Sequence, residues 1–130
     1  PSPPYPSPAG GGVPTVATTT PADRLILTKL DEATKDVTNH LDNFRLHEAA
    51  QDIYQFTWHE FADIYIEASK SQLADEAHRD NTVKILYAVL VDTLKLLHPF
   101  MPFVTEAIWG EMYGKEKLLM VEKWPGIASK

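Results

Sequence analysis

One apolar stretch decides the fold of this chain. It covers residues 81–99 and reads NTVKILYAVLVDTLKLLHP. Its thin polar strip consists of Lys84, Asp92 and Lys95. A helix that is apolar on most sides packs at the centre of a bundle. Because Asn81 is a good N-cap and a helix ends before Pro99, the sequence predicts a central, largely buried helix that starts near Asn81.

An amphipathic helix is predicted upstream of this stretch. Apolar residues recur there at steps of three and four, which is one face of a helix with 3.6 residues per turn. They are Ile26, Leu30, Ala33, Val37 and Leu41. Residues 20–23 offer N-terminal caps, with Pro21 suited to the entry position. The turn at Asp42-Asn43 is expected to end this helix.

A long second helix is predicted from Arg45 to Ser71. Its expected core stripe is Leu46, Ala50, Ile53, Thr57, Phe61, Ile64 and Ala68. An aromatic flank at helical spacing consists of Tyr54, Trp58, Phe61 and Tyr65. This flank either packs against a neighbouring helix, or offers a stacking platform for unpaired bases or a docking face for another domain. The polar residues 75–80 that follow are expected to be irregular.

The chain bends after the central helix, at the sequence His98-Pro99-Phe100-Met101-Pro102. A short helix is predicted from Pro102 to Tyr113, with Gly114 as its stop. Residues 118–121 are expected to form a short extended apolar run, which Trp124-Pro125 closes. The predicted fold class is therefore all-α, an up-and-down bundle of four to five helices.

The first 22 residues differ in composition from the rest of the chain. They hold seven of the ten prolines and none of the 30 charged residues. Such a segment buries too little apolar surface to form a core, so residues 1–22 are expected to be a flexible tail or linker and residues 23–130 the folded domain. Pro3 and Pro6 have the P-x-x-P spacing, so the alternative function of this segment is as a ligand for a proline-recognition domain. Because the chain begins with Pro and not Met, we interpret it as an excised fragment or a free-standing module.

Composition and charge exclude several classes of protein. The absence of cysteine excludes disulfide scaffolds and thiolate metal sites, and it fits a reducing compartment, with the cytoplasm as the expected location. No apolar run approaches the ~20 residues that cross a bilayer, and no signal peptide is visible. The net charge of −6 argues against binding nucleic acid over the whole surface, but it leaves room for a local basic site.

Two short motifs are similar to a metal-binding and a ligase motif, but a simpler interpretation is favoured for each. His59-Glu60-Phe61-Ala62-Asp63 is similar to the H-E-x-x-H zinc motif with Asp for the second His, but an exposed charged face is the favoured interpretation. Ala68-Ser69-Lys70-Ser71 is similar to the Lys-Met-Ser-Lys-Ser loop of some ligases, but it falls at the end of a long helix. We therefore expect no catalytic residue, no metal and no cofactor in this chain.

Several linked motifs together resemble a known family. They are Asp23–Leu30, Phe44–Ala50, Trp58–Glu67, Leu96–Trp109 and Trp124-Pro125. In this order and spacing they resemble the anticodon-binding helical domain of class Ia aminoacyl-tRNA synthetases. The valyl branch matches best, and the isoleucyl and leucyl branches come next. The family usually has an aromatic residue where Ile64 stands and often Cys where Ala62 stands. The adenylate-forming motifs of the family are absent.

The resemblance implies a domain that receives the anticodon arm of a tRNA, expected to be tRNA-Val, beside the catalytic domain of a parent ligase. ATP and magnesium would be used by that parent enzyme. No membrane and no DNA are expected as partners. The candidate tRNA-binding residues are Asn43, Phe44, Arg45, Tyr65, Lys70 and Arg79. Arg45 is the strongest of these, because a planar cation at a helix start can fork onto phosphate or guanine.

Two other functions stay open from the sequence. One is a helical protein-interaction module that has lost RNA binding, which the acidic net charge favours. The other is a metal-dependent hydrolase that uses His59, Glu60 and Asp63.

Overall fold

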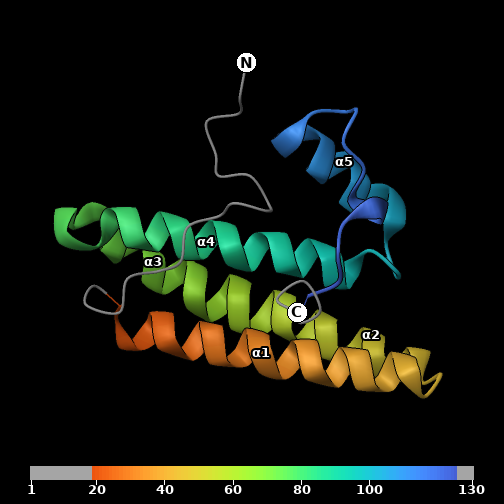
Figure 1. Cartoon of the computed structure of the whole chain (residues 1–130). Coiled ribbons are helices and arrows are strands. Elements are labelled where there is room, and N and C mark those ends of the chain that lie inside the picture. Colours follow the sequence, from red (N-terminus) through yellow and green to blue (C-terminus); the bar gives the residue numbers. More distant parts are fainter. Residues whose placement is uncertain (1–18, 126–130) are drawn as a thin grey trace.

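The computed structural model describes residues 19–125, which fold into helices only. The elements are α1 (Pro21–Asp42), α2 (Leu46–Gln55), η2 (Phe56–Ile66), α3 (Glu67–Ala74), α4 (Glu76–Leu97), α5 (Pro102–Tyr113) and η3 (Leu119–Val121). Figure 1 shows α1, the continuous α2–η2–α3 segment and α4 running up and down beside one another, with α5 folded back over α4. The predicted all-α, up-and-down bundle is therefore confirmed.

The first helix begins and ends where the sequence predicts. Thr20 and Asp23 form a capping box, in which the Thr20 side chain accepts from the Asp23 amide and the Asp23 carboxylate accepts from the Thr20 amide. Pro21 occupies the first turn, where a missing N–H does no harm. Four of the five predicted core residues of α1 are buried, and they are Ile26, Leu30, Ala33 and Val37. Of the tail predicted over residues 1–22, residues 1–18 lie outside the described part.

The second predicted helix exists, but its middle part is π-helical and its buried face differs from the predicted one. The residues that point into the core are Ala49, Ile53, Phe56, Phe61, Tyr65, Ser69 and Gln72. The five-residue step from Phe56 to Phe61 falls inside η2, where i→i+5 hydrogen bonds widen the turn. A stripe drawn with the α-helical period therefore fails here. Leu46 and Ile64, both predicted to be core, are 62% and 40% exposed.

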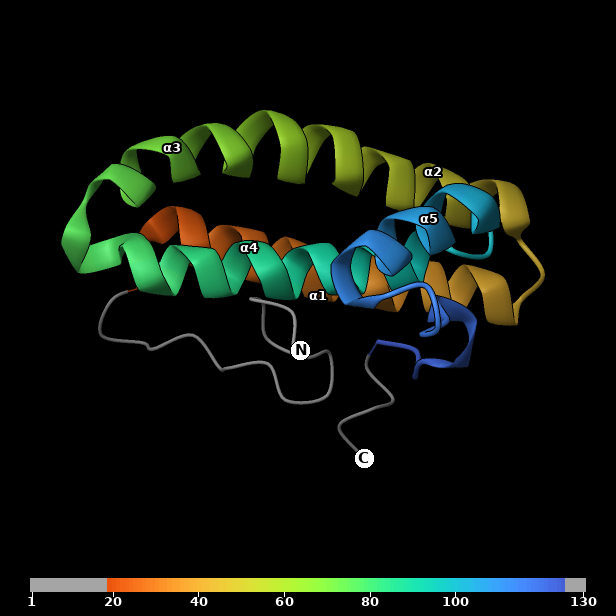
Figure 2. The same ribbon diagram turned by 90° about the horizontal axis from the view of Figure 1, so that it is seen from above.

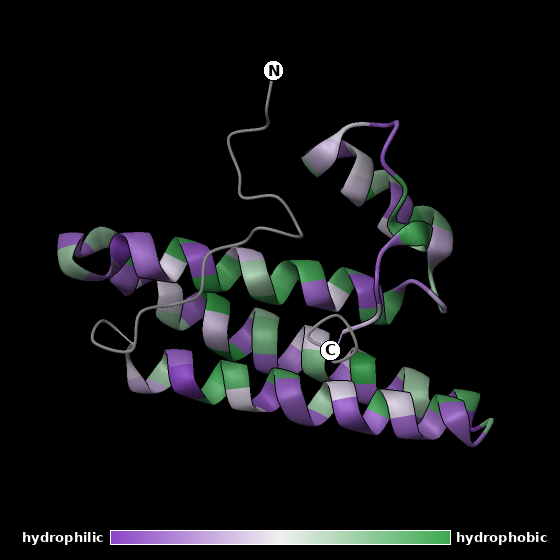
Figure 3. Cartoon of the chain, viewed as in Figure 1, coloured by the Kyte–Doolittle hydropathy of each residue, from purple (hydrophilic) through white to green (hydrophobic). Residues whose placement is uncertain are grey.

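The central helix is confirmed, but it starts five residues earlier than predicted. Asp75 is the N-cap of α4 and its side chain accepts from the amide of Ala77 at 3.0 Å. Residues 76–80, predicted to be irregular, form the polar first turns of the helix, and Asn81 is buried within it. Figure 3 shows these first turns in purple and the apolar continuation of α4 mostly in green. The apolar pattern alone could not reveal a helix start made of polar residues.

Two apolar clusters lie on opposite sides of α4. The larger joins α1, α2, η2 and α4, and its centre includes Val37, Ile53 and Val89, each with no exposed surface. The smaller joins α4 to α5 and η3 around Trp109. Figure 2 shows α2–η2–α3 as one bowed segment facing α1 and α4. No helix among residues 19–125 is long and apolar enough to span a membrane.

The last part of the described chain folds back onto the bundle. The bounds predicted for α5 are correct, and Gly114 follows it with a φ of 103°. The run predicted to be extended contains a 3-10 turn, because the Glu106 carboxylate accepts from the amides of Leu119 and Met120 at 2.8 and 2.9 Å. Trp124 then donates from Nε1 to Thr38 Oγ1 on α1 at 2.7 Å.

A buried carboxylate ties the helices together at one end of the bundle. Asp23 has no exposed surface and accepts hydrogen bonds from the Tyr65 hydroxyl at 2.6 Å, Gln72 Nε2 at 2.9 Å and the Thr20 amide at 3.0 Å. Gln72 Nε2 also donates to Thr82 Oγ1 on α4 at 3.0 Å. Burial raises the pKa of Asp23, but the hydrogen bonds outweigh it and hold the pKa below its usual 3.8. The network therefore links α1, η2, α3 and α4.

Removing this carboxylate is expected to destabilise the fold strongly. In Asp23→Ala the Tyr65 hydroxyl and the Gln72 amide lose their acceptor, and buried unsatisfied groups cost about 1–3 kcal/mol each. We expect the free energy of unfolding, measured by urea denaturation, to fall by about 3 kcal/mol. The control is Asp31→Ala on the exposed side of α1, which should change it by less than about 0.5 kcal/mol. Similar losses in both variants would contradict the role of the network.

The same carboxylate predicts a pH dependence. Because folding lowers the pKa of Asp23, its contribution to stability is fully present above about 3.8 and is lost as the pH falls through the lower pKa of the folded state. The difference in unfolding free energy between the chain and Asp23→Ala should therefore be constant at neutral pH and shrink at about pH 2.5. Urea denaturation at both pH values measures it. A difference that grows on acidification would rule out this assignment.

Candidate nucleic-acid interface

The corner between α1 and α2 is a Schellman turn with an unusual residue in it. The Phe44 amide donates to the Leu41 carbonyl at 3.1 Å and the Arg45 amide donates to the His40 carbonyl at 2.7 Å, which is the hydrogen-bond pattern of this motif. The pattern places Phe44 at the position that glycine or asparagine normally occupies. Its φ is +60°, and among the described residues it is the only non-glycine with a positive φ.

Within residues 19–125, burial of the Phe44 ring does not offset this strain. A side chain in the left-handed region costs about 1–2 kcal/mol, and only glycine, asparagine and aspartate visit it routinely. The Phe44 ring is also 90% exposed, so it contributes no burial. A strained and exposed aromatic ring is a feature that points to use by a ligand. Aromatic rings of this kind are the surfaces on which unpaired bases stack.

Polar and cationic groups flank this ring. The Arg45 side chain is 64% exposed and has only a loose ion pair with Glu48, at 3.7 Å. Asn43 donates from Nδ2 to the Asn39 carbonyl at 2.8 Å, which leaves its side-chain oxygen available as an acceptor. The structure therefore brings the three predicted residues Asn43, Phe44 and Arg45 together at one exposed corner.

A hydrogen bond between His40 and Asp52 lies just behind the corner. His40 Nδ1 on α1 lies 2.6 Å from Asp52 Oδ2 on α2, and both side chains are about one quarter exposed. The pair closes the reversal just behind the turn, so the corner sits on a rigid support.

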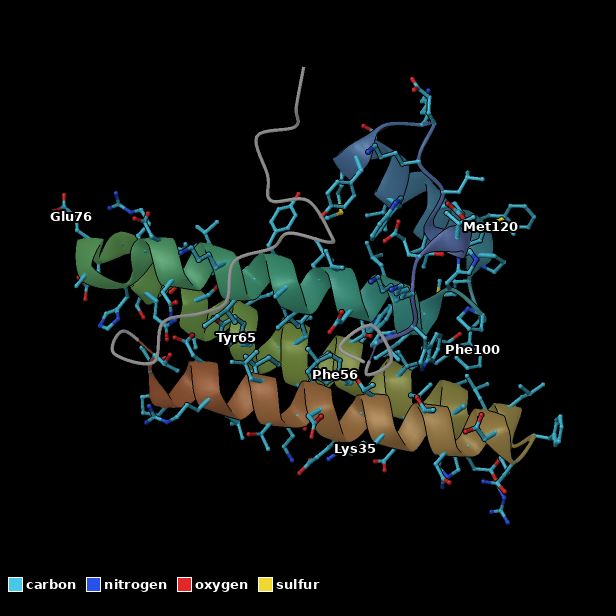
Figure 4. The ribbon with its side chains drawn as sticks, viewed as in Figure 1. Lys35, Phe56, Tyr65, Glu76, Phe100 and Met120 are labelled. Atoms are coloured by element: carbon cyan, nitrogen blue, oxygen red, sulfur yellow. The ribbon has the colours of Figure 1, made fainter. Side chains whose placement is uncertain are left out.

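The other predicted cations lie at the opposite end of the bundle. Lys70 donates to Glu67 Oε2 at 2.9 Å and Arg79 donates from Nε to the Leu73 carbonyl at 2.8 Å. Both lie near the α3–α4 turn, which Glu76 marks in Figure 4, whereas the α1–α2 corner lies at the end that Phe100 marks. Residues 46–74 form one helical segment between the two ends, which at ~1.5 Å per residue separates them by roughly 40 Å. The structure thus does not assemble the six predicted residues into one site.

The expectation that Tyr65 offers a surface to RNA is not met by its position. Tyr65 is 1% exposed, and its ring stacks on Phe61 while its hydroxyl donates to Asp23. Burial and the neighbouring carboxylate also raise the pKa of this hydroxyl well above its usual value. The predicted aromatic flank is therefore divided. Phe61 and Tyr65 belong to the core, whereas Tyr54 and Trp58 are 42% and 57% exposed.

Sequence reasoning missed one exposed aromatic residue at the corner's end of the bundle. Phe103 is 90% exposed at the start of α5. The α4–α5 corner that carries it lies at the same end of the bundle as the α1–α2 corner (Figure 1). His98 Nδ1 and Thr105 Oγ1, 2.9 Å apart, hold this second corner. Phe103 stands inside a largely apolar run, and no signal in the sequence marks it as exposed.

The zinc-like motif does not form a metal site among residues 19–125. His59 Nδ1 and Asp63 Oδ2 are 3.9 Å apart on an exposed face, and no group of three histidine or acidic side chains in the described residues is placed to hold a metal ion. The geometry here favours an exposed charged face over a hydrolase centre.

Comparison with known proteins identifies the family. The family model described as the anticodon-binding domain of tRNA ligase matches residues 23–130. The valine–tRNA ligase of Carboxydothermus hydrogenoformans is 46% identical over 105 residues, which cover 80% of this chain and 12% of that protein. Those of Clostridium tetani and Bacillus subtilis are 45% and 42% identical, and the matches again cover 12% of each protein. The chain therefore belongs to the anticodon-binding domain family of tRNA ligases, which confirms the resemblance seen in the sequence.

Relieving the strain at the corner is expected to stabilise the fold. Asparagine tolerates the left-handed region better than phenylalanine, so Phe44→Asn should raise the free energy of unfolding by about 0.5 kcal/mol. Urea denaturation measures the change. The control is Phe103→Asn, because Phe103 is equally exposed but lies in a helix, where asparagine and phenylalanine have similar propensities, so its stability should hardly change. A Phe44→Asn variant less stable than the parent chain would mean that the ring makes a stabilising contact.

Proposed function

We propose that this member of the anticodon-binding domain family binds the anticodon arm of a tRNA, specifically tRNA-Val, through the corner formed by Asn43, Phe44 and Arg45. The observation that carries the proposal is the strained, 90% exposed ring of Phe44 at a position where the fold alone favours glycine. The similarity to valine–tRNA ligases supports tRNA-Val over the tRNAs of the isoleucyl and leucyl branches.

Each residue at the corner has a distinct role in this proposal. The Phe44 ring stacks on a base of the anticodon loop, because recognition of single-stranded RNA depends on unstacked bases that are splayed onto aromatic side chains. The Arg45 guanidinium forks onto a phosphate or onto a guanine edge. The side-chain oxygen of Asn43 accepts from a base amino group. Tyr65 has no part in contact with RNA, since it is buried.

Lys70 and Arg79 serve a different part of the same ligand. They lie at the far end of the bundle, so they do not reach the loop that the corner binds. We assign them to backbone phosphates elsewhere on the tRNA, where cations contribute affinity without reading sequence. Because the chain has a net charge of −6, these few local cations have to act against an unfavourable background. The affinity should fall with salt, with a slope set by the small number of phosphates that these cations contact.

The ligation chemistry belongs to a larger parent enzyme in this proposal. The chain spans about an eighth of the length of the valine–tRNA ligases that it matches. Its described residues offer no cluster of three side chains that could hold a metal ion. We assign the binding of ATP and magnesium, and catalysis, to a catalytic domain beside this one. We propose the cytoplasm as the place where the enzyme acts. This chain contributes the positioning of the tRNA.

Two substitutions at the corner are expected to weaken tRNA binding. Arg45→Ala and Phe44→Asn should each weaken binding of tRNA-Val about tenfold, since a guanidinium fork or a stacked base contributes about 1–3 kcal/mol. Fluorescence anisotropy with labelled tRNA at about 50 mM salt measures the affinity, because higher salt would hide it. The control is Lys35→Ala, which removes one exposed cation from the middle of α1 and should have little effect.

The outcomes separate the proposed function from its alternatives. Unchanged affinity in both corner variants, or an equal loss in Lys35→Ala, would contradict the corner as the tRNA site. No tRNA binding at low salt by the intact chain would overturn RNA binding by this chain. Equal affinity for tRNA-Val and for isoleucine or leucine tRNA would contradict the assignment to valine.

A further inference from the structure

A groove runs between α1 and the π-helical segment, along the side of the bundle. It has a volume of about 680 Å³, and one wall carries the exposed edge-to-face pair of Tyr54 and Trp58, whose ring centroids are 5.9 Å apart. A smaller hollow adjoins it and shares Lys29 and Glu60 with the groove. The hollow adds two exposed aliphatic side chains, Leu25 and Ile64. The path along this side therefore carries exposed aromatic and aliphatic side chains.

The π-helix creates one wall of the groove. Phe56 and Phe61 both point into the core, five residues apart, because the wide turn advances the buried face by more than an α-turn does. Trp58, His59 and Glu60 are left together on the outside, and all three line the groove. The unusual helix type thus presents an aromatic ring and a carboxylate side by side on one surface.

The groove is acidic. Its four carboxylates are Glu32, Asp36, Asp52 and Glu60, against Lys29 as the one lysine or arginine in its lining. Glu32 lies 3.7 Å from Lys29, and Asp52 is paired with His40. Within residues 19–125, Asp36 and Glu60 have no ion pair. One carboxylate from each wall is therefore available to a cation from outside.

We propose that this groove binds a short basic segment of another protein. An arginine or lysine placed over Trp58 would gain a cation–π interaction and would reach the Glu60 or Asp36 carboxylate at the same time. Apolar residues of the same segment would pack on the exposed side chains of Leu25 and Ile64. The proposal goes beyond tRNA binding, and it uses none of the residues at the α1–α2 corner.

Charge selects this occupant over the others. RNA phosphates would be repelled by the carboxylates of the groove. Residues 1–18 of the chain itself contain no charged residue, so they cannot neutralise Asp36 and Glu60. A second copy of the chain would bring a net charge of −6 to an acidic surface. A basic segment of a partner protein satisfies both the aromatic and the acidic parts of the groove.

A peptide-binding experiment on the full chain tests the proposal. The probe is a fluorescein-labelled eight-residue peptide of alternating arginine and leucine, with anisotropy as the readout. The double variant Asp36→Asn/Glu60→Gln should weaken binding about tenfold, as two exposed ion pairs allow. Trp58→Ala should weaken it about fivefold through the lost cation–π interaction. Circular dichroism checks that each variant keeps its helicity.

Matched controls isolate the groove. The double variant Asp31→Asn/Asp63→Asn removes the same charge from the same two elements, outside the groove lining, and should leave affinity nearly unchanged. The peptide with glutamate for arginine should not bind, and an RNA hairpin with the anticodon-arm sequence should not displace the basic peptide.

Three results would overturn the proposal. Equal losses in the groove variant and in its charge-matched control would reduce the binding to net charge. Displacement of the peptide by the RNA hairpin, together with weaker hairpin binding by Trp58→Ala, would assign the groove to RNA. Self-association of the chain that Trp58→Ala abolishes would assign it to a second copy. Loss of tRNA binding in the corner variants has no bearing on these outcomes, so the two proposals fail separately.

Discussion

The buried carboxylate of Asp23 is the constraint on which the arrangement of the helices depends. A charge without contact to water is tolerated only when hydrogen bonds replace its hydration. Here the donors come from three places in the sequence, the Thr20 amide, the Tyr65 hydroxyl and the Gln72 amide. All three reach one carboxylate only if α1, η2 and α3 keep a single register. The network therefore fixes the axial register of the long helices relative to one another. Apolar contacts alone would allow several registers.

The two ends of the bundle differ in burial and in backbone strain. The Asp23 end is satisfied and buried, whereas the α1–α2 corner keeps a strained residue and an exposed ring. A strain of about 1–2 kcal/mol at Phe44 is a small part of the stability of about 5–15 kcal/mol that domains usually have. The corner can carry it because His40 and Asp52 hold the reversal just behind the turn. A rigid support is what an exposed recognition residue needs to keep its geometry.

The sequence predicted helix ends correctly where proline, glycine and asparagine set the local backbone conformation. Pro21 and Gly114 mark true helix ends, and the turn at Asn43 was placed correctly. It failed where the helix departs from the 3.6-residue period, since η2 moves Tyr65 into the core and leaves Ile64 exposed. It also could not see the left-handed conformation of the corner, because a phenylalanine in the glycine position carries no signal in a single sequence. The candidate site was thus located by its place between two helices, and its strain emerged from the structure alone.

The acidic net charge has a different meaning once it is placed on the structure. Charge at Asp36 and Glu60 lies along the side of the bundle, whereas the Arg45 cation lies at its end, well beyond the ~8 Å over which surface charges are screened at physiological salt. The carboxylates of Asp36 and Glu60 therefore do not cancel the attraction of Arg45 for phosphate. If both proposals hold, a ligand of each sign binds at the same time, and charge excludes each from the other's site. The overall balance of −6 then describes two separate surfaces, each with its own preference.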